Sequence, residues 1–382
     1  MDLLHTLLSF VASITIAVTL FLQTITGGLL TSEQKTAILS PTSTLPRANS
    51  PSATSSSQKV IGSSTPSVTK STKKPEAKLI SSTAATTTLP IVPVVPSPTI
   101  SSEVLNTQTR EALVNILCDV KGGGVRPISG SGVFIDSRGI ILTNAHIGQY
   151  FLLKDYPSPN NVECTIRTGS PAQPLYRATL LYLPPTWVAD NSTQLVAEQA
   201  KGTGENDYAF LLVTGAVGST PLPSIFPHVA MDMGEPMLGE STFLAAYAAG
   251  FLGGPNIQKN LYAVSAYAAV KELFTFGTNR NIDLVSIAGT IVSQGGSSGG
   301  AVVRASDGKL RGIIATATVA DSTAERDLRA ITLAHINRSL AAQGQGGLDV
   351  FLSQDATAAA ARFASITAPG EKDLLVKAIE HH

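Results

Sequence analysis

The chain has 382 residues, and its 27 Lys+Arg balance its 27 Asp+Glu, so the formal net charge is zero. This balance excludes a protein that holds nucleic acid on a broadly basic surface, because such a surface must replace the counterions of phosphate. Only 14% of the residues are charged, against about 25% in typical soluble domains. Two cysteines, Cys118 and Cys164, are too few for a disulfide-dense mini-domain or a four-cysteine zinc module.

An apolar segment opens the chain. No Asp, Glu, Lys or Arg occurs from Leu3 to Ser32. At about 1.5 Å per residue, Leu7–Leu30 is long enough to cross a hydrocarbon core about 30 Å thick. A cleaved signal peptide is the alternative, but no Lys or Arg precedes the apolar run and no A-x-A site follows closely. We therefore predict a membrane anchor or an uncleaved signal over residues 1–31.

Residues 32–103 are rich in Ser, Thr and Pro and contain no aromatic residue. Such a segment cannot bury enough apolar surface to offset the entropy of ordering, so a disordered linker is predicted. Its excess of basic residues would by itself favour the cytoplasmic side, but most of them lie far from the apolar segment. We expect a single-pass membrane protein whose globular part is extracytoplasmic.

Short β-branched and aliphatic runs, separated by turn residues, characterise the globular part from residue 104 onward. They favour an all-β sandwich or barrel. The predicted strands are Ser131–Ile135, Gly139–Thr143, Tyr208–Val213 and Gly312–Val319. A helical period appears over Glu325–Gln343 and is predicted to end the domain at residue 345. The Ala-rich tail, residues 346–382, is expected to be partly helical.

The sequence GGSSGGA, Gly295–Ala301, is the strongest local signal for chemistry. Glycines around a serine suit a loop whose backbone approaches a ligand and directs N–H groups at one oxygen. A flexible linker is the alternative, but this stretch is short and lies between apolar runs.

Two further segments contain the other groups that acyl transfer by a serine needs, a base and a carboxylate that orients it. His146 follows the apolar run of ILTNAHI, and Asp207 precedes the apolar run of NDYAFLL. Each residue is individually a weak signal, since a lone histidine is more often structural and an aspartate there is often a turn residue.

The segments SGSGVFI, IILTNAHI, NDYAFLL and GSSGGA occur in this order and resemble those of the trypsin-like (chymotrypsin-fold) serine peptidases, most closely the bacterial Htr/Deg group. The resemblance spans residues 114–340. It implies two six-stranded antiparallel β-barrels with a C-terminal helix and an active site in the crevice between the barrels. By motif, it makes His146, Asp207 and Ser298 the catalytic triad of a serine endopeptidase that forms an acyl-enzyme.

The resemblance also implies an oxyanion hole made by the backbone N–H groups of Gly296 and Ser298. One departure is Ser297, which stands where the family usually has Asp or Asn. Since Ser297 cannot pair with a newly freed N-terminus, activation by that route is not expected. Too few residues follow Ser298 for the PDZ module that many Htr relatives carry.

By offset from the family's motifs, the primary specificity pocket falls on two short segments. Their small or uncharged residues imply a small or medium apolar side chain before the scissile bond, rather than Lys or Arg. The pocket residues are Val292, Ser293, Gln294, Ala315, Thr316 and Ala317.

Cys118 and Cys164 flank the histidine segment. They form either a disulfide within the first barrel or two buried thiols, and the sequence leaves both readings open. The remaining histidines show no ligand spacing, so neither a metal nor a cofactor is expected. Protein or peptide substrates are the expected partners, and nucleic acid is not.

Two other functions are compatible with parts of the sequence. GSSGG also matches the nucleophile elbow of an α/β-hydrolase esterase, for which Ser298, Asp321 and His335 have the required order. An elbow needs a helix directly after the serine, whereas Ala301–Val319 reads as strand, turn and strand. The other alternative is a catalytically inactive peptidase fold that serves as a binding module on a stalk.

Overall fold

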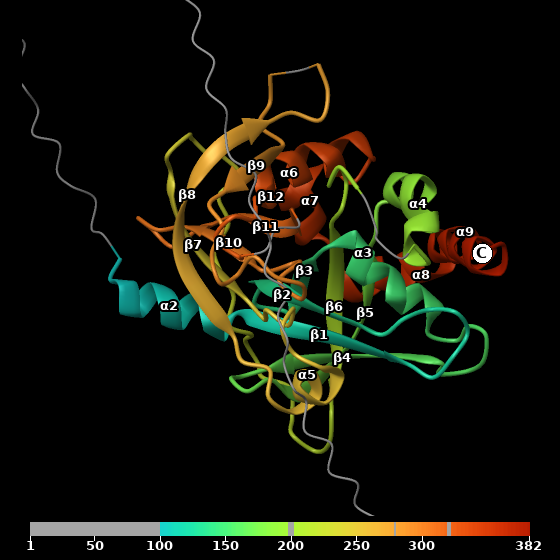
Figure 1. Cartoon of the computed structure of the whole chain (residues 1–382). Coiled ribbons are helices and arrows are strands. Elements are labelled where there is room, and N and C mark those ends of the chain that lie inside the picture. The colour runs from blue at the N-terminus through green and yellow to red at the C-terminus, as the bar shows by residue number, and fades with distance from the viewer. Residues whose placement is uncertain (1–99, 198–201, 279, 319–321) are drawn as a thin grey trace, which may run out of the picture. The chain divides into compact units, whose positions relative to one another are not determined.

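Figure 1 shows the computed structural model of the chain, which describes residues 100–197, 202–278, 280–318 and 322–382. The predicted anchor and nearly all of the predicted linker lie outside these residues. Among the helices of the described part, none has the length and apolar character that a bilayer crossing needs.

Two closed antiparallel barrels of six strands each form the body of the molecule, as predicted. Their strand orders are equivalent, since the first closes as β1-β2-β3-β6-β5-β4 and the second as β7-β8-β9-β12-β11-β10. The first barrel consists of β1 (Leu113–Val120), β2 (Ile128–Asp136), β3 (Ile140–Thr143), β4 (Val162–Thr168), β5 (Gln173–Tyr182) and β6 (Ala209–Ala216). The second consists of β7 (Ser241–Ala246), β8 (Val264–Phe274), β9 (Leu284–Ile287), β10 (Ala301–Arg304), β11 (Leu310–Ala317) and β12 (Leu328–Thr332).

Burial on both faces of the sheet explains why these apolar runs form strands. All four residues of β3 are buried, and so are Phe210 and Leu211 on the neighbouring β6. The predicted turn between Ile135 and Ile140 closes the β2–β3 hairpin, where Asp136 accepts a hydrogen bond from the backbone N–H of Arg138 at 2.8 Å. Closure of the sheet leaves no open strand edge in either barrel.

Helices connect and flank the barrels. Helix α2 (Ser102–Glu111) precedes the first barrel in the chain. The connection from β3 to β4 contains α3 (Ala145–Gly148) and η1 (Gln149–Leu153), and α4 (Pro185–Asn191) and η2 (Ser192–Leu195) follow β5. Helix α5 (Gly254–Lys259) lies between β7 and β8 of the second barrel. The last strand, β12, is followed by α6 (Leu333–Ala342), α7 (Gly347–Ser353), α8 (Ala356–Ile366) and α9 (Ala368–Glu380).

The prediction of a helix over Glu325–Gln343 was wrong for its first eight residues. Leu328–Thr332 forms β12, which pairs with both β9 and β11 and closes the second barrel. The helix α6 begins only at Leu333, where the Thr332 hydroxyl caps it by accepting a hydrogen bond from the His335 N–H at 3.0 Å. Strand pairing on both sides therefore outweighs the local helical period.

The C-terminal segment packs on the first barrel. Helix α8 contacts β5, and α9 contacts α4 and η2 (Figure 1). Phe351 of α7 and Phe363 of α8 pack edge-on against Tyr182 of β5, with their ring centroids 5.9 and 6.1 Å from that of Tyr182. The residues predicted as a partly helical tail thus form three helices that contribute to the first barrel's core.

Cys118 and Cys164 form a disulfide in the structure. The two residues are direct register partners on β1 and β4, so the bond lies within the first barrel. In the chain-entropy description, closing a loop of 46 residues stabilises the fold by roughly 3–4 kcal/mol.

Candidate active site

His146 lies at the C-terminal end of β3, in the short helix α3. Asn144, in extended conformation, ends the strand and begins the helix. The apolar neighbours Ala145 and Ile147 are fully buried, whereas the His146 side chain keeps 30% of its surface exposed. The buried neighbours therefore fix the backbone while the imidazole faces outward.

Asp207 lies two residues before the start of β6, and both of its carboxylate oxygens bind His146. Oδ2 lies 2.8 Å from His146 Nδ1, and Oδ1 accepts the His146 backbone N–H at 2.9 Å. The backbone O of Asp207 accepts a further hydrogen bond from Asn144 Nδ2 at 2.9 Å. This geometry fixes the imidazole with a hydrogen on Nδ1, so that Nε2 of the neutral ring is free to accept a proton.

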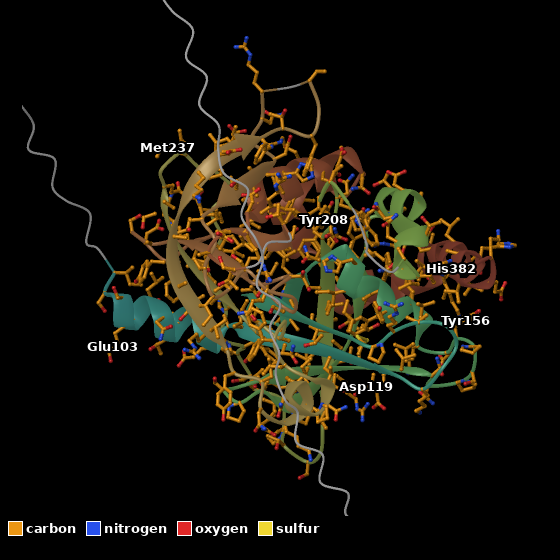
Figure 2. All side chains as sticks on the ribbon, viewed as in Figure 1. Glu103, Asp119, Tyr156, Tyr208, Met237 and His382 are labelled. Atoms are coloured by element: carbon orange, nitrogen blue, oxygen red, sulfur yellow. A yellow bond between two sulfur atoms is a disulfide. The ribbon has the colours of Figure 1, made fainter. Side chains whose placement is uncertain are left out.

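A left-handed residue positions Asp207. Asn206 has φ 57°, and its Oδ1 accepts a hydrogen bond from Ser339 Oγ of α6 at 2.6 Å. Tyr208, labelled in Figure 2 and fully buried, has its hydroxyl 2.8 Å from the same Ser339 Oγ. The turn that presents Asp207 is therefore held by a helix of the second barrel.

Ser298 lies in the loop before β10, within GGSSGGA. Its hydroxyl is 3.4 Å from the backbone O of Ala315, to which it donates a long hydrogen bond. No hydrogen bond joins Ser298 to His146 in the part of the chain that the structure describes. Such bonds are often long in unliganded sites and tighten only when substrate is present.

The backbone N–H groups of Gly296 and Ser298 donate no hydrogen bond to a protein acceptor within the described residues. Gly296 has φ 88°, and a Cβ there would lie 2.7 Å from Tyr247 O, so only glycine fits. The two predicted oxyanion donors are therefore unpaired in a loop whose conformation depends on glycine.

His146, Asp207 and Ser298 line one cavity of about 450 Å³. Ala315 lines it too, together with Trp187 of α4, the chain's single tryptophan, and Leu195 of η2. The connection between β5 and β6, which contains α4 and η2, thus forms one wall. Sequence reasoning missed this wall, although a lone tryptophan beside apolar residues was a signal for it.

The predicted specificity residues divide into two groups. Ala315 is buried beside Ser298, whereas Val292 and Ser293 are fully buried and, like Gln294, are not among the residues lining this cavity. The backbone O of Ser293 accepts a hydrogen bond from Arg326 Nη1 at 2.8 Å. Thr316 and Ala317 continue β11 opposite Arg329 and Leu328, and their side chains are outside the described part.

The esterase arrangement is not supported by this fold. The residues after Ser298 form strand β10 rather than a helix, and the domain is all-β. His335 Nδ1 is 3.0 Å from Asp283 Oδ1, and Asp321 lies outside the described residues. Nor do the described residues contain three His, Cys, Asp or Glu grouped so as to hold a metal ion.

The charge of Asp207 controls the protonation of His146. Burial by itself would lower the pKa of His146, but the negative charge of Asp207 and the hydrogen bond to it outweigh this effect. The pKa is therefore raised above the ordinary value of 6.5.

Comparisons with known proteins give one family match. Residues 130–313 match the family model of the trypsin-like peptidase domain. No curated protein sequence matches the chain.

Solved structures similar to this chain include the Rv3671c protease and Deg5. The active form of the Rv3671c protease from M. tuberculosis is 19% identical with a TM-score of 0.40, over 68% of this chain and 93% of that chain. Deg5 is 16% identical with a TM-score of 0.40, over 61% of this chain and 89% of that chain. The two closed six-stranded barrels, and not these similarities, define the fold of this chain.

The raised pKa of His146 predicts how the reactivity of Ser298 depends on pH. A protonated imidazole cannot accept the Ser298 proton, so labelling of Ser298 by a fluorophosphonate should rise with pH, with a midpoint above about 6.5. In Asp207→Asn the midpoint should fall, because burial then acts without the opposing charge, and the maximal rate should drop by about 10³–10⁴-fold.

The pH profile of the labelling rate between pH 5 and 9 measures both effects. NMR titration of His146 in Ser298→Ala provides the control, because it follows the imidazole without the reaction. A midpoint that is unchanged by Asp207→Asn would contradict the prediction.

Proposed function

We propose that the chain, whose residues 130–313 match the family model of the trypsin-like peptidase domain, is a serine endopeptidase that hydrolyses peptide bonds through Ser298, His146 and Asp207. Ser298 Oγ attacks the peptide carbonyl while its proton moves to His146 Nε2, and the same proton is then donated to the leaving amine. Asp207 holds the Nδ1–H tautomer and stabilises the imidazolium. Water, activated by His146, then hydrolyses the acyl-enzyme.

The developing oxyanion would be bound by the backbone N–H groups of Gly296 and Ser298. Both are unpaired within the described residues, and both belong to the loop that contains the nucleophile. Each such donor typically contributes about 10²–10³-fold to turnover.

One observation carries the proposal. The carboxylate of Asp207 binds both the ring Nδ1 and the backbone N–H of His146, and this pair lines the same cavity as Ser298. A His–Asp pair with only a structural role would not need an adjoining cavity or a partly exposed imidazole. Nor would it need a neighbouring serine loop whose Gly296 and Ser298 N–H groups are unpaired within the described residues.

Covalent labelling tests the nucleophile. A fluorophosphonate should modify the intact chain at Ser298, and peptide mapping by mass spectrometry should locate the adduct there. Ser298→Ala should abolish labelling, and His146→Ala should slow it by about 10³-fold or more, since no base remains to accept the proton.

Ser297→Ala is the matched control, because its hydroxyl is buried, adjacent in sequence and without a partner among the described residues. It should label at close to the wild-type rate. Absence of labelling in the intact chain from pH 6 to 9 would instead favour the inactive binding module.

We further propose a preference for a small or medium apolar side chain before the scissile bond. One feature supports it: Ala315, a small apolar residue that lines the cavity and whose backbone O lies 3.4 Å from the Ser298 hydroxyl. Because alanine offers no carboxylate, the charge of a substrate Lys or Arg would be left without a partner at this position.

A peptide library tests this preference. Cleavage should be fastest after Ala, Val or Leu and at least about 10-fold slower after Arg, the scale of one unfavourable charge contact. Preferred cleavage after Arg in the wild type would overturn the proposal.

We also propose that residues 1–31 anchor the chain in a membrane with the peptidase domain outside the cytoplasm. The support is the uncharged run Leu7–Leu30, and the disulfide between Cys118 and Cys164 suits an oxidising compartment.

Extraction of cell membranes at alkaline pH tests the anchor. The full chain should remain in the membrane pellet, and a chain lacking residues 1–31 should not. Protease added outside intact cells should digest the domain. Recovery of a soluble chain whose intact mass lacks the N-terminal segment would show a cleaved signal instead.

A further inference from the structure

We propose that Ser131 is a positioning residue that keeps the N–H groups of Gly296 and Ser298 directed at the substrate oxygen. The proposal rests on the proposed function of Ser298. Ser131 is fully buried on β2, in the first barrel, whereas the loop it contacts belongs to the second barrel.

Every polar group of Ser131 forms a hydrogen bond. Its backbone N–H donates to Ser298 O at 2.7 Å, and its hydroxyl donates to Gly296 O at 2.8 Å. The same hydroxyl accepts the Tyr247 N–H at 2.9 Å. Its backbone O accepts the Thr143 hydroxyl at 2.7 Å. Ser131 thus joins the nucleophile loop to both barrels at once.

The bonds of Ser131 fall on alternate peptide units of the loop. One holds the carbonyl of the 296–297 peptide and the other that of the 298–299 peptide. Between them lies the 297–298 peptide, which carries the Ser298 N–H, and its carbonyl accepts the Gly300 N–H at 2.9 Å. That peptide cannot rotate while both of its neighbours are held.

The Gly296 N–H is directed in a related way. It belongs to the 295–296 peptide, whose carbonyl accepts the Ala249 N–H at 2.7 Å. Because the N–H and C=O of a trans peptide point in opposite directions, this bond turns the Gly296 N–H away from Ala249. Ser131 holds the following peptide through Gly296 O, so the unit is fixed at both ends.

The contact between Ser131 and the loop is too close to tolerate a side chain at position 299. A Cβ at Gly299 would lie 2.0 Å from Ser131 O and 2.6 Å from Thr143 Oγ1. The backbone of the nucleophile loop therefore rests directly on Ser131.

Alanine at position 131 would remove the hydroxyl alone. The Tyr247 N–H would lose its acceptor and Gly296 O its donor, both in a buried place where unpaired polar groups are unfavourable. The 296–297 peptide could then turn, and the oxyanion donors would shift with it. The backbone bond to Ser298 O would remain, so the nucleophile itself would stay in place.

The test compares Ser131→Ala with the wild-type full chain on a peptide substrate that the wild type cleaves. We expect kcat to fall about 10–100-fold with KM changed less than about 2-fold, because only the transition state places charge on the oxygen. Affinity for a peptide aldehyde, which forms an oxyanion on Ser298, should fall by a similar factor. The pH midpoint set by His146 should not move.

Ser129→Ala is the matched control. Ser129 lies on the same strand, and its hydroxyl accepts a hydrogen bond from Asn115 Nδ2 at 2.9 Å, so this variant also loses a hydrogen bond of β2 but none to the loop. Its kcat should stay at the wild-type value. Thr143→Val, which removes only the bond to Ser131 O, should lower kcat several-fold and decides the question if Ser131→Ala does not fold.

The outcomes separate this inference from the proposed function. If the wild type is not labelled at Ser298 by a fluorophosphonate, the proposed function fails. If the wild type is labelled but Ser131→Ala keeps its kcat, loses no more than Ser129→Ala, or changes only KM, the positioning role of Ser131 is refuted while the proposed function stands.

Discussion

Hydrogen bonds that cross between the two barrels are the constraint on which the site depends. The imidazole and carboxyl come from the first barrel, and the serine loop comes from the second. The reaction we propose requires the barrels to stay in one relative position to within a fraction of an ångström. The bond from Ser131 N–H to Ser298 O crosses this boundary at the loop itself. Arg167, buried on β4, crosses it again by donating to the backbone O of Ile257 and of Gln258.

Elements outside the barrels complete the site. Helix α9 packs on α4 and η2, and these two elements contribute Trp187 and Leu195 to the cavity beside His146. The C-terminal helices are in turn held by Phe351 and Phe363 against Tyr182. The residues farthest along the chain therefore support one wall of the cleft, and the shape of that wall depends on packing that begins far from His146, Asp207 and Ser298.

Much of the fold followed from local patterns. Apolar runs and turn residues predicted the strands around Ser131–Ile135 and Gly312–Val319 and an all-β sandwich or barrel. The resemblance to the trypsin-like peptidases, and not the local patterns, implied the two six-stranded barrels that the structure contains. The helical period from Glu325 was misleading, because Leu328 and Ile331 are three positions apart, as on one face of a helix, whereas in β12 they are buried on opposite faces of the strand. Only the partners β9 and β11 decide between the two. The helical content of residues 346–382 was underestimated, because their alanines give little periodic signal. The contacts of Phe351 and Phe363 with Tyr182 of the first barrel are visible only in the structure.

The sequence by itself determined which chemical groups are available and in which local setting. GGSSGGA requires a glycine-dependent loop, and NAH and ND place a histidine and an aspartate at strand ends, because backbone conformation and hydrophobic alternation act over a few residues. Tertiary structure alone decided that Asp207 binds His146 twice and that Cys118 is joined to Cys164. Tertiary structure alone also placed Ser131, a buried residue of the first barrel, in hydrogen-bond contact with the serine loop of the second barrel. The residues that Ser131 contacts in this loop are more than a hundred positions away in the chain, so these hydrogen bonds depend on how the two closed barrels pack. No local sequence pattern encodes such a contact.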